Sequence, residues 1–365
     1  MYLYIIFSVL SVLAILEVCR IKFKGLPLFY NYAYIFIISV IFLLSMLRWE
    51  NGTDWASYFN YFNSVGKNLN TGYMEIGYTL LCYLGYNYLN YTLFLGIIGF
   101  LSIVPVAIRI KEYSHFPLLA LLIWFSTSFA HMFPVRQTVA VSLFIFSWKY
   151  IQNRRLFPFI CIIAAASTFH LPVLITLPIY FIWNKYIPAK IFISIILGLF
   201  FLSIISNNIF SNFFYSLGNI GNSYIEDKIN AYMDNSDETF GSVYSPFQVL
   251  VRGCINRSFY FFLPLMLLNE KRKENSVMNA VFNMYFYSFS LFLIVTPLSM
   301  ALGRLTSYTD ISQLFLLPFL FTLKMNKKNT ILIITIIVLY LSLRFNGVVS
   351  NYKDLYIPYH SVLFK

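Results

Sequence analysis

Five arginines lie within long apolar segments or at their ends, where a charged side chain is costly. Arg48 ends one such segment, Arg136 opens another, Arg252 and Arg257 lie within a third, and Arg304 follows a fourth. Charges at membrane depth are unfavourable unless they are paired or hydrated, so each is a candidate for function. Snorkelling or a structural ion pair also explains any one of them. As a set, they indicate anion binding through the bidentate guanidinium fork.

The sequence around Arg136 gives the sharpest of these candidates. It reads His131-Met-Phe-Pro134-Val-Arg136-Gln137. Proline suits the first turn of a helix, so Pro134 predicts that a helix begins here. The free N–H groups of that helix end and the guanidinium would together suit a phosphate. Because several arginines are present, we expect an anion with more than one charge, such as a pyrophosphate.

A polar segment from Arg48 to Tyr58 carries a second kind of candidate, a carboxylate. Gly52 permits a tight turn. Asp54 is placed either to cap the next helix or to accept a proton from a substrate hydroxyl. Several aromatic residues lie close to Asp54 in the sequence. Such a group is typical of an interfacial belt or of a surface on which sugar rings stack. The aromatic residues are Trp49, Trp55, Tyr58, Phe59, Tyr61 and Phe62.

His170 is a third kind of candidate, an imidazole after the apolar run Ala164-Ala-Ala-Ser-Thr-Phe169. A lone histidine is more often a satisfied helix-end residue than a catalyst, but its predicted place on the same side as Arg136 favours function. The sequence contains no metal-ligand spacing, serine nucleophile elbow, Walker loop or dinucleotide motif. The four scattered cysteines predict neither a zinc site nor disulfides. We therefore expect no metal and no cofactor.

These residues belong to a chain with the composition of a membrane protein. Of its 365 residues, 59% are hydrophobic and only 11% are charged, and the mean hydropathy is +0.71. A soluble domain carries about 25% charged residues. A soluble core of this size could not bury so much apolar surface. We predict an all-α polytopic integral membrane protein that forms a single transmembrane domain over residues 1–365.

Apolar segments near the length of a spanning helix, about 20 residues, follow one another along the chain. About twelve spans are predicted, at 2–19, 31–47, 91–108, 117–132, 136–151, 156–170, 171–184, 190–206, 247–268, 279–302, 307–323 and 329–345. The first lacks a basic n-region and an Ala-x-Ala site, so we interpret it as a retained span. Segment 74–90 is also apolar but is interrupted by Gly77 and Gly85. It could therefore form a half-helix or a re-entrant segment instead of a full span.

Lysines and arginines in alternate loops set the predicted orientation. One set of loops holds sixteen of the 26 Lys and Arg and four of the 14 acids, and the rest of the chain holds ten of each. The basic side is therefore predicted to be cytoplasmic, with both termini outside. The candidate residues then share the outer side with the polar segments 48–73, 207–245 and 346–365. Since topology explains the net positive charge, no nucleic-acid partner is expected.

The order of the candidates resembles that of a known family. The pattern is Arg48-x3-Gly52-x-Asp54-x3-Tyr58, then Glu75-x-Gly77-Tyr78, then Arg136-Gln137-x2-Ala140, then Phe169-His170. It resembles the EpsG-type, Wzy-like polysaccharide polymerases of bacteria over roughly residues 45–185. The last half of the chain agrees with this family mainly in topology and in having a sizeable outer loop, at 207–245. The resemblance implies a fold similar to that of the lipid-dependent membrane glycosyltransferases.

The resemblance also implies a reaction. Such polymerases link repeat units carried on undecaprenyl pyrophosphate at the outer, periplasmic face of the cytoplasmic (inner) membrane. A lipid-linked oligosaccharide would be both donor and acceptor, with membrane lipid and a chain-length regulator as further partners. Substrate-binding roles are expected for Arg48, Arg136, Gln137, Arg252, Arg257 and Arg304. Asp54 and His170 are alternative proton acceptors for the attacking hydroxyl, and the sequence does not decide between them.

Two other classes of protein share some of these features. A lipid-linked oligosaccharide flippase should place polar groups along a path through the membrane, whereas the centres of these spans are nearly free of charge. A membrane-bound sugar O-acyltransferase would use a histidine such as His170 within an apolar stretch. Its acyl-CoA donor is cytoplasmic, however, and the predicted site is external. The sequence therefore favours the polymerase.

Overall fold

The computed structural model describes residues 2–19, 26–52, 54–69, 73–128, 135–205, 246–297, 302–351 and 353–364. The predicted outer segment 207–245, and His131 and Pro134 of the motif before Arg136, lie outside these residues. The described residues form helices and turns, with one isolated antiparallel bridge between Arg48 and Ser361. The chain divides into two compact units, Met1–Leu177 with Leu317–Lys365, and Pro178–Leu316.

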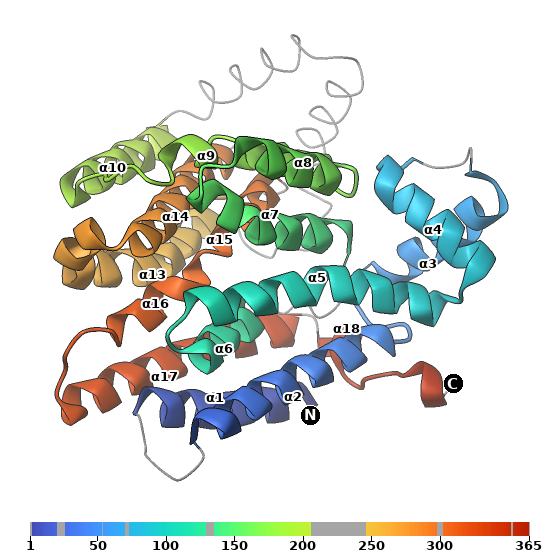
Figure 1. Ribbon diagram of the computed structural model, residues 1–365, viewed down its shortest axis with the longest axis horizontal. Helices are drawn as coiled ribbons and strands as arrows, with labels where there is room; N and C mark the ends of the chain where they lie inside the picture. Colours follow the sequence, from blue (N-terminus) through green and yellow to red (C-terminus); the bar gives the residue numbers. More distant parts are fainter. Residues whose placement is uncertain are drawn as a thin grey trace. The chain divides into compact units, whose positions relative to one another are not determined.

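The first unit is built of helices that pack mainly on two of their number, α5 and α6 (Figure 1). Its α-helices are α1 (Tyr2–Val18), α2 (Leu26–Met46), α3 (Trp55–Lys67), α4 (Ile76–Tyr88), α5 (Tyr91–Tyr113), α6 (Pro117–Thr127), α7 (Arg136–Gln152), α8 (Leu156–Ser167), α17 (Lys327–Asn351) and α18 (Lys353–Tyr356), and its 3₁₀ helices are η3 (Leu171–Thr176) and η5 (Val362–Phe364). Both α1 and α17 pack on α6, α2 and α7 pack on α5, and α3 pairs with α4. Residues Leu118 to Ser126 of α6 are all buried, as expected of a helix that is apolar on every side.

A carboxylate stabilises the start of this central helix. Glu17 of α1 accepts hydrogen bonds at Oε2 from the backbone N–H groups of Leu118 and Leu119, at 3.0 and 3.2 Å. These N–H groups have no partner within the helix, so the side chain of Glu17 satisfies donors that would otherwise be left unbonded.

The second unit is built on α10 (Ala189–Ile205), α13 (Pro246–Glu274) and α14 (Ser276–Val295), which pack on one another. Its shorter elements are α9 (Ile179–Ile182), η4 (Leu302–Thr306) and α15 (Ser307–Asp310), and the chain returns to the first unit within α16 (Gln313–Leu320). Side chains satisfy the backbone carbonyls between α9 and α10. Asn283 donates to Ile182 at 2.7 Å, and Arg272 donates to Ile187 at 2.7 Å.

Two predicted spans are not continuous helices, which corrects the sequence interpretation. Segment 171–184 forms η3 and the four-residue α9, because Pro178 lacks an N–H donor and crowds the preceding turn. Segment 307–323 is interrupted after Asp310, where the amide of Ser312 bonds to the carbonyl of Thr309 in a 3₁₀ turn.

Two other helices agree with the sequence interpretation. The α7 helix begins at Arg136, the first residue of the predicted span 136–151. In segment 74–90, α4 has thirteen residues, a length that fits the half-helix alternative.

Four helices in the described part of the chain are long and apolar enough to cross a membrane: Leu28–Met46, Tyr91–Tyr113, Ser276–Val295 and Lys327–Asn351. The predicted count of about twelve spans is therefore not confirmed by helix length. Large apolar side chains on these helices face outward; Phe36 of α2 is 68% exposed and Leu343 of α17 is 76% exposed. Exposed apolar surface of this kind suits lipid as the solvent.

Candidate functional site

Arg136 opens α7, and its guanidinium forms an ion pair with Glu75, the residue before α4. The Glu75 side chain is 7% exposed and the Arg136 side chain 20%. Tyr58 of α3 makes a side-chain hydrogen bond with the same guanidinium. Three helices of the first unit thus bring a guanidinium, a carboxylate and a phenol together. We call these three residues the Arg136 cluster.

Close packing at Gly77 fixes the position of Glu75. The amide of Gly77 donates to the carbonyl of Thr168 at 2.8 Å, and a Cβ at this glycine would lie 2.2 Å from Thr168 Oγ1. Glycine therefore permits an approach between α4 and the end of α8 that a larger residue would block. Thr79 Oγ1 lies 3.0 Å from the carbonyl of Glu75 and 2.6 Å from the Tyr61 hydroxyl, which ties α3 to α4.

Part of the Arg136 guanidinium has no protein partner. Its Nε is buried and has no hydrogen-bond partner among the described residues. The N-cap residue of α7, Val135, has no side-chain acceptor and cannot cap the first-turn N–H groups. Burial raises the pKa of Tyr58, so its hydroxyl keeps its proton near neutral pH. Because Glu75 balances the guanidinium charge, the cluster offers an anion hydrogen-bond donors, at Arg136 Nε and in the first turn of α7, rather than net positive charge.

Arg48 lies on the segment between α2 and α3. It is 4% exposed, and Tyr78 and Tyr91 lie near enough to act on its charge. The chain then turns through Glu50 and Gly52, whose φ angles are 52° and 104°. The predicted tight turn at Gly52 is confirmed, since this φ favours glycine.

Asp54 occupies the N-cap position of α3, but its side chain makes no capping hydrogen bond. The capping alternative is therefore not realised, and the residue is exposed. The charge of Asp54 acts on Tyr58, opposing ionisation of the phenol. Asp54 thus borders the Arg136 cluster.

His170 and Gln137 are both partly exposed. Gln137 is the second residue of α7, and His170 immediately precedes η3. The amide of His170 donates to the carbonyl of Ala166 at 3.0 Å, which fixes its backbone at the end of α8. Since Thr168 contacts Gly77 and Phe169 packs on the same aromatic core as Tyr58, the 168–170 segment adjoins the Arg136 cluster.

Half of the six predicted aromatic residues are core, since Trp55, Tyr61 and Phe62 are buried. Trp55 is 8% exposed and stacks on Phe59 with ring centres 4.9 Å apart, and Tyr91 meets Phe59 edge-on at 4.8 Å. These rings join α3 to α5. Trp49 is partly exposed at the edge of this core, 4.7 Å from Trp55. Its position suits contact with a ligand better than that of the buried rings.

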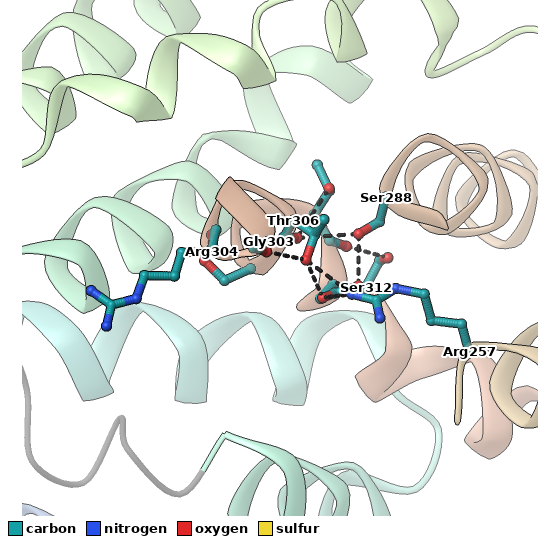
Figure 2. A network of polar contacts seen from close by, with 9 residues as sticks. Arg257, Ser288, Gly303, Arg304, Thr306 and Ser312 are labelled. Atoms are coloured by element: carbon teal, nitrogen blue, oxygen red, sulfur yellow. Dashed lines mark hydrogen bonds and ion pairs between the residues drawn. The ribbon is translucent and has the colours of Figure 1, made fainter. Parts of the chain in front are cut away.

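The second unit contains its own polar network, centred on the ion pair between Arg257 of α13 and Asp310 of α15. Figure 2 shows this network, with Arg257, Ser288 and Thr306 pointing toward one another. Arg257 Nη2 donates to Asp310 Oδ2 at 2.7 Å and to Thr306 Oγ1 at 2.9 Å. Ser288 of α14 donates to Asp310 Oδ1 at 2.7 Å. The guanidinium carbon lies 3.9 Å from the centre of the Phe292 ring, a cation–π contact. The network holds three helices together.

The three candidate arginines of this unit, Arg252, Arg257 and Arg304, differ in their surroundings. A Cβ at Gly253 would lie 2.0 Å from the Phe292 ring, so this glycine makes room for the ring on which Arg257 lies. Arg257 Nε is buried without a hydrogen-bond partner in the described ranges. Arg252 and Arg304 are exposed. Figure 2 shows the Arg304 guanidinium pointing away from the network.

The sequence interpretation missed three functional candidates. Glu75 and Tyr58 were recognised only as parts of a motif, although they contact Arg136 directly. Asp310 was not recognised at all. A signal was present, because an acid within the predicted apolar span 307–323 requires a partner.

Comparison with known proteins decides the family. The sequence model of the EpsG family matches residues 31–361, nearly the whole chain. The chain belongs to the EpsG family. No protein of curated function and no solved structure matches it.

The EpsG match includes every candidate from Arg48 to Arg304 and spans both units. Together with the apolar helices, it identifies this EpsG-family chain as a multi-pass membrane protein. Membership in the family also indicates a function of the polysaccharide-polymerase type.

Proposed function

We propose that this EpsG-family protein is a glycosyltransferase of the O-antigen and exopolysaccharide polymerase type. It transfers a growing glycan from undecaprenyl pyrophosphate onto a lipid-linked repeat unit at the outer face of the bacterial cytoplasmic membrane. The observation that carries this proposal is the Arg136 cluster. Residues from four of the sequence motifs lie in or beside it, and a buried guanidinium Nε there lacks a partner among the described residues.

In the proposed reaction, the acceptor hydroxyl oxygen forms a bond to the anomeric carbon of the donor. The bond from that carbon to the pyrophosphate oxygen breaks, and undecaprenyl pyrophosphate leaves with the electron pair. The hydroxyl proton passes to Asp54 or His170. Undecaprenyl pyrophosphate is a good leaving group that needs no general acid, but its developing charge needs stabilisation.

Arginines supply that stabilisation in the proposal. Donor and acceptor each carry a pyrophosphate, and each unit of the chain has its own set of arginines. Arg48 and Arg136, with Gln137, are proposed as phosphate ligands of the first unit. Arg252, Arg257 and Arg304 are proposed as those of the second. A guanidinium matches phosphate through paired hydrogen bonds that a lysine cannot reproduce.

A clean deletion strain tests this function. We expect surface glycan of single repeat units, with lipid-linked single units persisting outside, since chain growth stops while unit synthesis continues. A flippase mutant would instead trap the units on the cytoplasmic leaflet. An acyltransferase mutant would keep full-length polymer without acyl groups. Gel electrophoresis and mass spectrometry of the glycan separate the three outcomes, and polymer of normal length and composition would refute the proposal.

A further inference from the structure

The C-terminal segment of the chain pairs with the turn that carries Arg48. The amide of Val362 donates to the carbonyl of Leu47 at 3.0 Å, and the amide of Trp49 donates to the carbonyl of His360 at 2.9 Å. These bonds flank Arg48 on both sides. They join residues more than 300 positions apart within the first unit.

A second set of bonds holds the turn itself. Asn51, which is 1% exposed, donates to the carbonyl of Pro358 at 3.3 Å and accepts from the amide of His360 at 2.9 Å. The amide of Gly52 donates to the carbonyl of Leu355 at 3.1 Å. The turn contains Glu50 at φ 52°, a conformation that costs about 1 kcal/mol or more for a residue other than glycine. Bonds to the C-terminal segment offset that cost.

The same segment forms part of the surroundings of Arg48. Tyr356 and Tyr359 lie near enough to act on the Arg48 charge, as Tyr78 and Tyr91 do from α4 and α5. Arg48 is thus buried among tyrosines from both parts of the unit. Removal of the C-terminal segment would expose one side of the guanidinium and release its turn.

We propose that residues 353–362 position Arg48 for the pyrophosphate group of a lipid-linked substrate, which makes the C-terminal segment part of the substrate site. This inference rests on the proposed function. Arg48 would contact the phosphates in the bound substrate and in the transition state alike. Misplacing it should therefore raise KM more than it lowers kcat. Loss of folded protein would lower kcat at unchanged KM, so the two effects are separable.

The test compares three variants of the purified protein, with lipid-linked single units as substrate. Asn51→Ala removes all three side-chain bonds to the segment, those with Leu355, Pro358 and His360, and we expect it to raise KM by about tenfold with kcat within about threefold. Deletion of residues 353–365 should raise KM further, and a synthetic peptide of that sequence should restore it in part. Phe364→Ala, at a side chain that is 90% exposed and lies beyond residues 353–362, should leave both constants unchanged.

Two results would overturn the positioning role. One is a KM that stays at the wild-type value after the deletion. The other is a decrease in kcat alone that the peptide does not reverse. Absence of oligomer from the wild-type protein would instead refute the proposed function. In that case, the anisotropy of a fluorescent 353–365 peptide, added to the truncated protein, still tests docking. Weaker binding with Asn51→Ala supports docking at the Arg48 turn, and equal affinity contradicts it.

Discussion

At the scale of single residues, the Arg136–Glu75 pair complicates simple mutagenesis. Removing one partner of a buried ion pair costs about 3–5 kcal/mol, because the other charge is left buried and unpaired. The Glu75 side chain is 7% exposed, so Arg136→Ala would combine a loss of chemistry with a loss of stability. A variant that removes both charges at similar volume avoids this problem.

We expect Arg136→Lys to reduce long polymer by at least about tenfold, equivalent to about 1.4 kcal/mol. Lysine keeps the positive charge beside Glu75 but loses the planar fork that pairs with phosphate. The double variant Arg136→Met/Glu75→Gln should reach normal protein levels and make no long polymer. Chain length on a gel, at equal protein level by immunoblot, gives the readout. Full-length polymer from the double variant would exclude Arg136 from the site.

A second residue-scale prediction concerns Asp310. Its carboxylate accepts hydrogen bonds from Arg257 and Ser288, on two different helices. Asp310→Asn weakens a charge-assisted bond and should lower the free energy of unfolding by about 2 kcal/mol. The exposed Asp354 provides the matched control, because Asp354→Asn should change stability little. Thermal denaturation in detergent compares the two, and equal midpoints would contradict a stabilising role for Asp310.

At the scale of helices, glycines that allow close contacts make a prediction about packing. A Cβ at Gly77 would lie 2.2 Å from Thr168 Oγ1 and 2.9 Å from the Thr168 carbonyl oxygen, so α4 must move away from α8 in Gly77→Ala. We expect a loss of about 1–3 kcal/mol. A Cβ at Gly347 in α17 would meet no neighbouring atom of the described residues within 4 Å, so Gly347→Ala should be neutral or stabilising. A stable, active Gly77→Ala protein would mean that this close contact does not position Glu75.

The turn between α9 and α10 depends on a buried arginine. Arg272 is 1% exposed, donates to the carbonyl of Ile187 at 2.7 Å, and lies over the Phe192 ring at 4.8 Å. Arg272→Met should therefore lower the unfolding midpoint, through a loss of about 1–3 kcal/mol for the unsatisfied carbonyl. Lys273→Met, at the exposed neighbour, should have little effect. Equal midpoints would show that Arg272 is dispensable for the turn.

Sequence pattern predicted single helices well where apolar runs were uninterrupted. The start of α7 at Arg136 agrees with the predicted span 136–151, although the N-cap is Val135 and the first turn does not include Pro134. The breaks in 171–184 and 307–323 were missed, because apolar composition hides the lost backbone bonds at Pro178 and the turn after Asp310. The pairing of Arg48 with Ser361 could not be predicted, since no local pattern specifies a contact so distant in sequence.

At the scale of the whole molecule, the predicted topology has a direct test. A periplasm-active reporter fused after Asn351 or after Asn235, which lies outside the described residues, should be active. A fusion after Lys273 should be inactive, because Lys271, Arg272 and Lys273 end α13 in a basic cluster. An active reporter at Lys273 with a silent one at Asn235 would reverse the orientation and move the candidate site to the cytoplasmic face.

The central claim is that this chain joins lipid-linked units without any other sugar donor. Its most direct test supplies the purified protein with lipid-linked single repeat units and no nucleotide sugar. We expect oligomers of the repeat unit and one released undecaprenyl pyrophosphate for each bond formed, since the lipid pyrophosphate is the leaving group. Single units that remain unchanged with folded wild-type protein, with no pyrophosphate released, would contradict the account.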